Sequence, residues 1–163
     1  MEHTSTLPKT PPERILVPLD GSPLAELALT EAVALSQLPG TEVTLLQVVP
    51  PIENVIMVGL ERFAVDQQWE IQRDQALDYL RGVAARPEWH GVQVDVAVHM
   101  GQPAETILAF AEKHGIGRIV MSTHGRTGLG RWVFGSVAEK VLRATSTTVV
   151  LVRPTATEGP AAR

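Results

Sequence analysis

Glycine and arginine residues gather between positions 116 and 138 in a pattern that is typical of anion binding. Five glycines and three arginines, Arg118, Arg126 and Arg131, fall in this stretch, and no Asp or Glu does. The whole chain carries a formal net charge of −4, whereas this stretch is positively charged. The contrast indicates a local positive field that would attract an anion. An apolar run at 118–122 precedes the glycines and a helical pattern follows them. This order aims backbone N–H groups and the positive end of a helix dipole at a phosphate.

Two common phosphate-binding fingerprints do not fit this stretch. Residues 130–137 (GRWVFGSV) have the glycine spacing of a Walker A loop, but Ser136 stands where that loop requires Lys. Residues 125–132 (GRTGLGRW) lack the third glycine of a dinucleotide-binding turn and follow the fourth predicted strand rather than the first. Ser136 and Glu139 have the spacing of a capping box, which predicts a helix that begins at Val137. The Ser136 hydroxyl then either caps the helix only or also donates a proton to a phosphate oxygen.

Five apolar runs that alternate with helical patterns predict the framework around this stretch. Alternating strands and helices in a chain of 163 residues predict a parallel sheet with helices on both faces. Ser22 is the expected N-cap of the first helix, with Pro23 at its first position. The strands are expected at 14–19, 42–49, 92–100, 118–122 and 147–152, and the helices at 23–38, 60–86, 103–114 and from 137 onward.

The hydrophobic patterns of the strands indicate their places in the sheet. Residues 92–100 alternate apolar and polar side chains, which favours an edge strand with one wet face. Residues 118–122 and the last strand, from Thr147 to Val152, have the pattern of strands buried on both faces. The unpaired backbone groups of an apolar edge strand readily pair with a strand of another chain. We therefore expect a homodimer formed through the last strand. The alternative is that the last strand is a buried central one.

Composition limits the class of protein. The chain has no Cys, which excludes thiol catalysis and thiolate metal sites. Its 14 Lys and Arg against 18 Asp and Glu are the wrong balance for broad neutralisation of nucleic-acid phosphates. No apolar run approaches the roughly 18 residues that span a bilayer, and the first dozen residues do not resemble a signal peptide. We expect a cytoplasmic protein without membrane or nucleic-acid partners, made of one domain (13–154) between flexible tails (1–12 and 155–163).

The glycine-rich stretch resembles that of the universal stress protein family. Nucleotide-binding members of this family carry G-x2-G-x9-G-[S/T] after the fourth strand. Ser122, Gly125, Gly135 and Ser136 occupy these positions, with Ser122 in place of the first glycine. The resemblance extends through RILVPLDGS, LLQVV, the GxP at 101–103 and VVLVRP.

This resemblance implies a fold and a ligand site. The fold is a flavodoxin-like α/β sandwich of three layers, similar to adenine nucleotide alpha hydrolases, with a five-stranded parallel sheet in the order 3-2-1-4-5. The winding direction reverses between strands 1 and 4, so the ligand crevice is expected past their carboxyl ends. The implied nucleotide-binding residues are Pro18, Leu19, Asp20, Val48, Ser122, Gly125, Arg126, Gly135, Ser136 and Val137.

The implied roles leave alternatives open at three positions. Asp20 would lie near the ribose and an accompanying Mg²⁺, or act only as a turn residue in DGSP. The Val48 backbone would face adenine, or Val48 would be a plain core residue. Arg126 would reach the phosphates, or be a solvated loop residue. Gly125 and Gly135 would let the backbone approach the anion closely.

The expected function is binding of ATP or ADP, or AMP, with at most slow hydrolysis. Hydrolysis is expected to be slow because the sequence shows no Walker lysine and no general base placed for water. The main alternative is an interaction protein of the same fold that has lost nucleotide binding, which Ser122 in place of glycine favours. A third hypothesis, a group-transfer enzyme related to nucleotidyl transferases, is supported only by similarity of fold.

Overall fold

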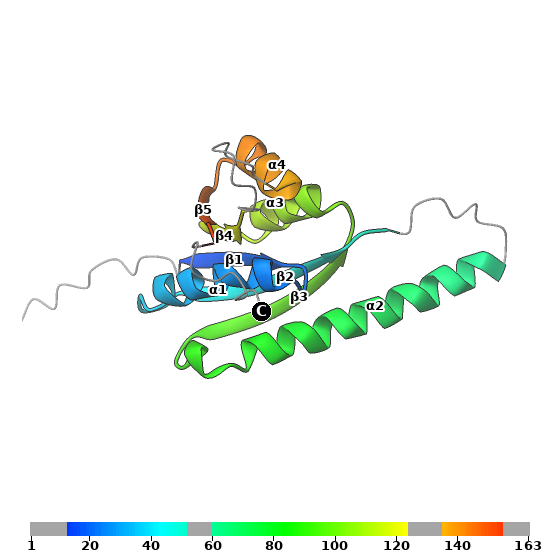
Figure 1. The fold of residues 1–163 in the computed structure, drawn as a ribbon, viewed down its shortest axis with the longest axis horizontal. Helices are drawn as coiled ribbons and strands as arrows, with labels where there is room; N and C mark the ends of the chain where they lie inside the picture. The colour runs from blue at the N-terminus through cyan, green and yellow to red at the C-terminus, as the bar shows by residue number, and fades with distance from the viewer. Residues whose placement is uncertain (1–12, 52–59, 124–134, 155–163) are drawn as a thin grey trace, which may run out of the picture.

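Five parallel strands form one sheet at the centre of the protein, in the order β3-β2-β1-β4-β5 (Figure 1). The computed structural model describes residues 13–51, 60–123 and 135–154, with the backbone alone for 60–66. The expected flavodoxin-like order is confirmed, and every neighbouring pair of strands runs parallel. The strands are β1 (Arg14–Leu19), β2 (Glu42–Val49), β3 (Gln93–Met100), β4 (Arg118–Ser122) and β5 (Thr148–Val152).

Two helices cover each face of the sheet, which gives the three expected layers (Figure 1). Alternate residues of a strand point to opposite faces. In β1, Ile15 and Val17 therefore pack with α1 and α2, whereas Leu16 packs with α3 and α4. The helices are α1 (Pro23–Leu35), α2 (Leu60–Ala84), α3 (Pro103–Lys113) and α4 (Ser136–Ala144), and a single 3₁₀ turn, Pro87–Trp89, lies between α2 and β3.

Side chains that bond to backbone groups set the ends of the first helix. The Ser22 hydroxyl accepts from the Ala25 N–H at 3.1 Å, which confirms the expected N-cap. The helix ends at Leu35 instead of residue 38, because the Ser36 hydroxyl bonds the Val33 carbonyl and the Thr41 hydroxyl bonds the Leu38 carbonyl. The chain then turns toward β2 through Gly40, whose φ of +83° suits glycine.

The helix α2 also ends earlier than expected, at Ala84 rather than residue 86. Pro87 explains this difference, because a proline disfavours helical geometry in the residue before it. Arg86 is accordingly extended, with ψ of 144°. The N-terminal part of α2 projects beyond the sheet in Figure 1.

The last strand is an edge strand, and its residues are only partly buried. The expected burial of residues 147–152 on both faces is wrong, as is the alternative of a central position, because β5 pairs with β4 alone among the described strands. The expected edge position of β3 is confirmed, and β4 is buried at its centre. In the part of the chain that the structure describes, no helix has the length and apolar character needed to cross a membrane.

Candidate functional site

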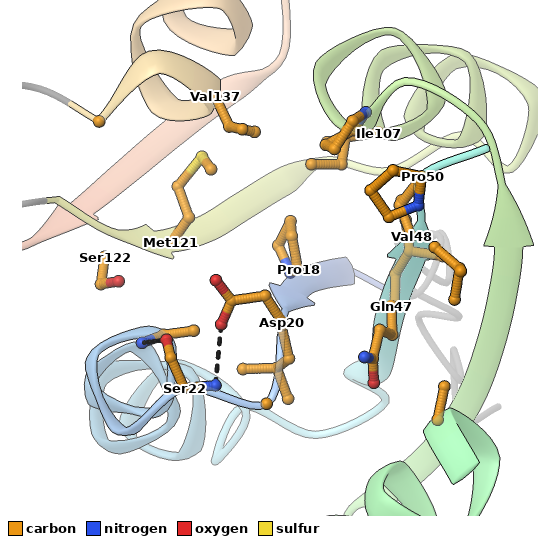
Figure 2. Close-up of a pocket in the computed structure, with 18 of the residues that line it drawn as sticks. Pro18, Asp20, Ser22, Gln47, Val48, Pro50, Ile107, Met121, Ser122 and Val137 are labelled. Carbon is orange, nitrogen blue, oxygen red and sulfur yellow. Dashed lines mark hydrogen bonds between the residues drawn. The ribbon is translucent and has the colours of Figure 1, made fainter. Parts of the chain in front are cut away.

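A cavity of about 680 Å³ opens at the carboxyl ends of β1, β2 and β4 (Figure 2). The volume is within the usual range of small-molecule sites, and the position is the point where the strand order reverses, at which α/β sheets bind ligands. Apolar groups make most of its walls. The described lining residues are Pro18–Ser22, Leu24, Ala25, Leu46–Pro50, Gln72, Gln75, Ala76, Tyr79, Pro103, Ile107, Met121, Ser122 and Gly135–Ala138.

The turn after β1 fixes Asp20 at the mouth of this cavity. Its Oδ1 accepts from the Ser22 N–H at 2.9 Å, shown as the dashed line in Figure 2. Gly21 provides the positive φ, +81°, that the turn requires. Asp20 is exposed and is the only charged side chain among the described lining residues. Asp20 therefore stabilises the turn and also lines the cavity. Its role in the turn does not exclude a role in ligand binding.

The N-terminus of α4 forms the wall opposite this turn. Gly135 is the N-cap, and the first helical bond runs from the Glu139 N–H to the Gly135 carbonyl at 2.9 Å. The N–H groups of Ser136, Val137 and Ala138 therefore precede the helical bonding pattern and are free to bind an anion. Ser136 itself is exposed.

The expected capping box at this helix is wrong. Gly135, not Ser136, is the N-cap, so the helix begins one residue earlier than Val137. The Glu139 carboxylate does not return to the helix start, because it accepts from Arg143 one turn further along at 2.8 Å. The Ser136 hydroxyl is therefore not used as a cap, and Ser136 lines the cavity.

The structure brings eight of the ten sequence-predicted residues to one cavity. Val48 contributes from β2 and Ser122 from the end of β4, both half-buried. Gly125 and Arg126, together with the rest of 124–134, lie outside the described residues. The eight that line the cavity are Pro18, Leu19, Asp20, Val48, Ser122, Gly135, Ser136 and Val137.

Sequence reasoning missed the wall that α2 contributes. Gln72, Gln75, Ala76 and Tyr79 line the cavity from this helix, and Gln47 lines it from β2. One signal was present in the sequence, because Gln47 interrupts the apolar run LLQVV at a position where a buried strand needs no polar side chain.

A hydrogen-bonded cluster holds the α2 wall against α1. The Tyr79 hydroxyl donates to the Glu26 carboxylate at 3.0 Å, and Glu26 also pairs with Arg86 at 2.9 Å. Burial, and then Glu26, raise the pKa of Tyr79 above its ordinary value. The phenol therefore stays neutral at physiological pH, and its proton is directed at Glu26 rather than at the cavity.

Comparison with known proteins decides the family. The sequence model described as the universal stress protein family matches residues 12–153. The chain belongs to the universal stress protein family. The family resemblance carried by the glycine-rich stretch and the DGS turn is therefore confirmed.

Individual members of the family are similar over most of the chain. Universal stress protein MJ0531 of Methanocaldococcus jannaschii is 32% identical over 145 residues, which cover 86% of this chain and 82% of the relative. The solved structure of MJ0577, from the same organism, superposes with a TM-score of 0.74 at 30% identity, over 88% of this chain and 96% of that one. An Arabidopsis thaliana family member with AMP bound shares the fold, with a TM-score of 0.57 at 17% identity, over 92% of this chain and 97% of that one.

Proposed function

We propose that this protein binds an adenine nucleotide, ATP or ADP, in the cavity at the carboxyl ends of β1, β2 and β4. The observation that carries the proposal is the convergence of the DGS turn, the end of β4 and the free N-terminus of α4 on one cavity. The AMP bound to the Arabidopsis thaliana family member supports an adenine nucleotide as the ligand class.

The phosphates would lie at the α4 end of the cavity. Three backbone N–H groups and the positive end of the helix dipole point there, and this combination favours an anion without any lysine. The hydroxyls of Ser122 and Ser136 add two donors from different elements. Ser122 replaces a glycine of the family pattern, and in this arrangement its hydroxyl would donate a hydrogen bond where glycine would only leave space.

The base would lie in the apolar part of the cavity. Leu46 and Ile107 are almost fully buried there, at 0% and 2% exposure, and Pro18 and Val48 line the same cavity. A flat aromatic ring buries apolar area in such a slot, while its polar edge turns to whatever hydrogen-bonding groups the walls provide. The cavity volume of about 680 Å³ accommodates both parts of the ligand.

Hydrolysis of the bound nucleotide would be slow. Asp20 is the only acidic side chain among the described lining residues, and its Oδ1 already accepts from the Ser22 N–H. Phosphoryl transfer depends on positioned cations and on a residue that orients the water. The described residues of this cavity provide neither, so the nucleotide acts as a bound signal or stabilising ligand.

The direct test of the proposal is to unfold the purified protein and analyse the supernatant for nucleotides. We expect ATP or ADP to be released, and the refolded or stripped protein to bind ATP with a sub-millimolar dissociation constant in calorimetry. Absence of released nucleotide together with no measurable ATP affinity would contradict the proposal. That result would favour an interaction protein of the same fold.

Magnesium fits this site as a companion of the phosphates rather than as a resident metal. No group of three metal-ligating side chains occurs among the described residues, but Mg²⁺ is often held by one carboxylate plus phosphate oxygens and waters. Asp20 can provide that carboxylate. We expect Asp20→Asn to abolish the dependence of ATP affinity on Mg²⁺ and to leave the turn intact, since Asn keeps the acceptor for the Ser22 N–H. Titrations of both proteins with ATP, with Mg²⁺ and with EDTA, measure this, and an equal Mg²⁺ effect in the two would refute the role of Asp20.

The open edge of β5 supports a homodimer. This strand is apolar, partly exposed and paired on one side only among the described strands, which is the kind of edge that proteins usually cover. We expect sedimentation at micromolar concentration to give twice the mass of one chain. A species with the mass of one chain would rule out pairing through 147–152 as a stable interface.

A further inference from the structure

The turn between β3 and α3 joins two walls of the cavity. The Gly101 N–H donates to the Val49 carbonyl at 3.1 Å, one position beyond Met100, the last residue of β3 that pairs with β2. Two residues after Gly101, Pro103 begins α3. Val49 and Pro103 both line the cavity, so this turn fixes the α3 wall to the end of β2.

Gly101 lies so close to the first turn of α3 that a side chain does not fit. A Cβ at Gly101 would collide with the Thr106 Oγ1. Thr106 cannot withdraw freely, because its N–H donates to the Gln102 carbonyl at 2.9 Å as the first helical bond of α3. Its β-branched side chain also has few χ1 rotamers in a helix. The φ of Gly101, +157°, is one that residues with a Cβ rarely adopt, so both the contact and the backbone require glycine.

The contact between Gly101 and Thr106 determines where the α3 wall stands. Thr106 directly precedes Ile107, and Pro103 lies one helical turn before Ile107 on the same side of α3. Pro103 and Ile107 line the cavity. Ile107 belongs to the same apolar cluster as Val48 of β2 (Figure 2). A shift of the first turn of α3 would therefore move this wall of the cavity relative to β2.

We propose that Gly101 and Thr106 are positioning residues for the base of the nucleotide. Neither is among the described lining residues, so they act through Pro103 and Ile107. A gap of about 0.5–1 Å already removes a quarter to a half of the dispersion attraction between apolar atoms, so a flat ring needs its walls held closely. The inference rests on the proposed function, which places the base beside Leu46 and Ile107.

The test uses two ligands that each represent one part of the nucleotide. Adenosine carries the base without phosphates, and inorganic tripolyphosphate carries the charge without the base. We expect Gly101→Ala to lower the affinity for adenosine by about tenfold, and to leave the affinity for tripolyphosphate within about twofold of the wild type. Calorimetry measures both affinities. A general structural defect would lower the two affinities together.

Two further variants separate the contact from a loss of stability. The double variant Gly101→Ala, Thr106→Ala removes the atom that the new Cβ meets, so it should recover much of the affinity for adenosine. Gly40→Ala is the matched control, because Gly40 also has a positive φ, +83°, but nothing lies within 4 Å of its Cβ position and it is outside the cavity lining. It should lower the melting temperature and keep the wild-type affinity for both ligands.

The outcomes distinguish failure of this inference from failure of the proposed function. An unchanged affinity for adenosine in Gly101→Ala, or an equal loss for both ligands, overturns the positioning role, and no recovery in the double variant overturns the part of Thr106. A wild type that binds tripolyphosphate but not adenosine overturns this inference alone. A wild type that binds neither ligand overturns the proposed function as well. If Gly101→Ala does not fold, Thr106→Ile, which places a larger group against Gly101, is measured instead and should show the same selective loss.

Discussion

Substitution of Ser136 by Glu is expected to lower the affinity for ATP by at least about 100-fold while the protein stays folded. Ser136 is exposed, stands at the first position of α4 and lines the cavity. A carboxylate there would occupy the anion site and repel the phosphates. Two like charges about 4 Å apart repel by about 4 kcal/mol at the effective dielectric near a protein surface, and a 100-fold loss corresponds to roughly 2.7 kcal/mol.

The same substitution should not destabilise the fold. An acidic side chain in the first turn interacts favourably with the helix dipole, typically by about 0.3–1 kcal/mol. Ser136→Gln is the matched control, because Gln has the size of Glu without its charge. Calorimetry with ATP and a thermal melt of each variant measure both effects. Equal losses of affinity in the Glu and Gln variants would show that bulk rather than charge is responsible, and unchanged affinity in the Glu variant would place the phosphates elsewhere.

Truncation of Leu16 to Ala is expected to lower the free energy of unfolding by about 3–4 kcal/mol. Leu16 is fully buried in β1, the central strand of the sheet, and packs with α3 and α4 on the face that also carries Leu46 and Ile107. Few side-chain rearrangements can fill a gap under a central strand, so the cavity term adds to the lost burial. Because Asp20 directly follows β1, this variant also weakens the support of the site.

The control for this prediction is the same substitution at Leu38, which is 57% exposed in the turn after α1. We expect Leu38→Ala to change the unfolding free energy by less than about 0.5 kcal/mol. Urea unfolding followed by circular dichroism measures both variants against the wild type. Similar losses at the two positions would contradict the assignment of the core.

Hydrophobic patterns were sufficient to place the strands along the chain, whereas the strand order came from the family resemblance. The bounds of β1, β2 and β4 agree with the expected 14–19, 42–49 and 118–122, because their apolar runs stop at Pro, Gly or polar residues. The ends of α1 and α2 were less predictable. Ser36 and Thr41 bond to nearby carbonyls that a periodicity count does not consider, and the effect of Pro87 falls on the residue before it.

The candidate site was predictable where its residues follow a strand, and not where a helix packs across it. Asp20 and Ser122 stand at strand ends, so the strand order alone brings them together. The contribution of Gln72 and Tyr79 depends on how α2 lies on the sheet, which no local pattern encodes. The capping box failed for a local reason instead. Arg143, one turn further along the helix, offers Glu139 a partner that competes with the helix start.

The measurement that tests the central claim most directly is an amide-resolved NMR titration of the nucleotide-free protein with ATP. We predict that the largest shift changes occur at the N–H groups of Ser136 and Val137, with further changes at Ser122 and Val48, and that they saturate together at sub-millimolar ATP. Adenosine should shift Val48 but leave Ser136 and Val137 nearly unchanged, because it carries no phosphate. If ATP saturates without shifting the amides at the start of α4, or shifts only residues outside the cavity, the nucleotide does not bind where this account places it.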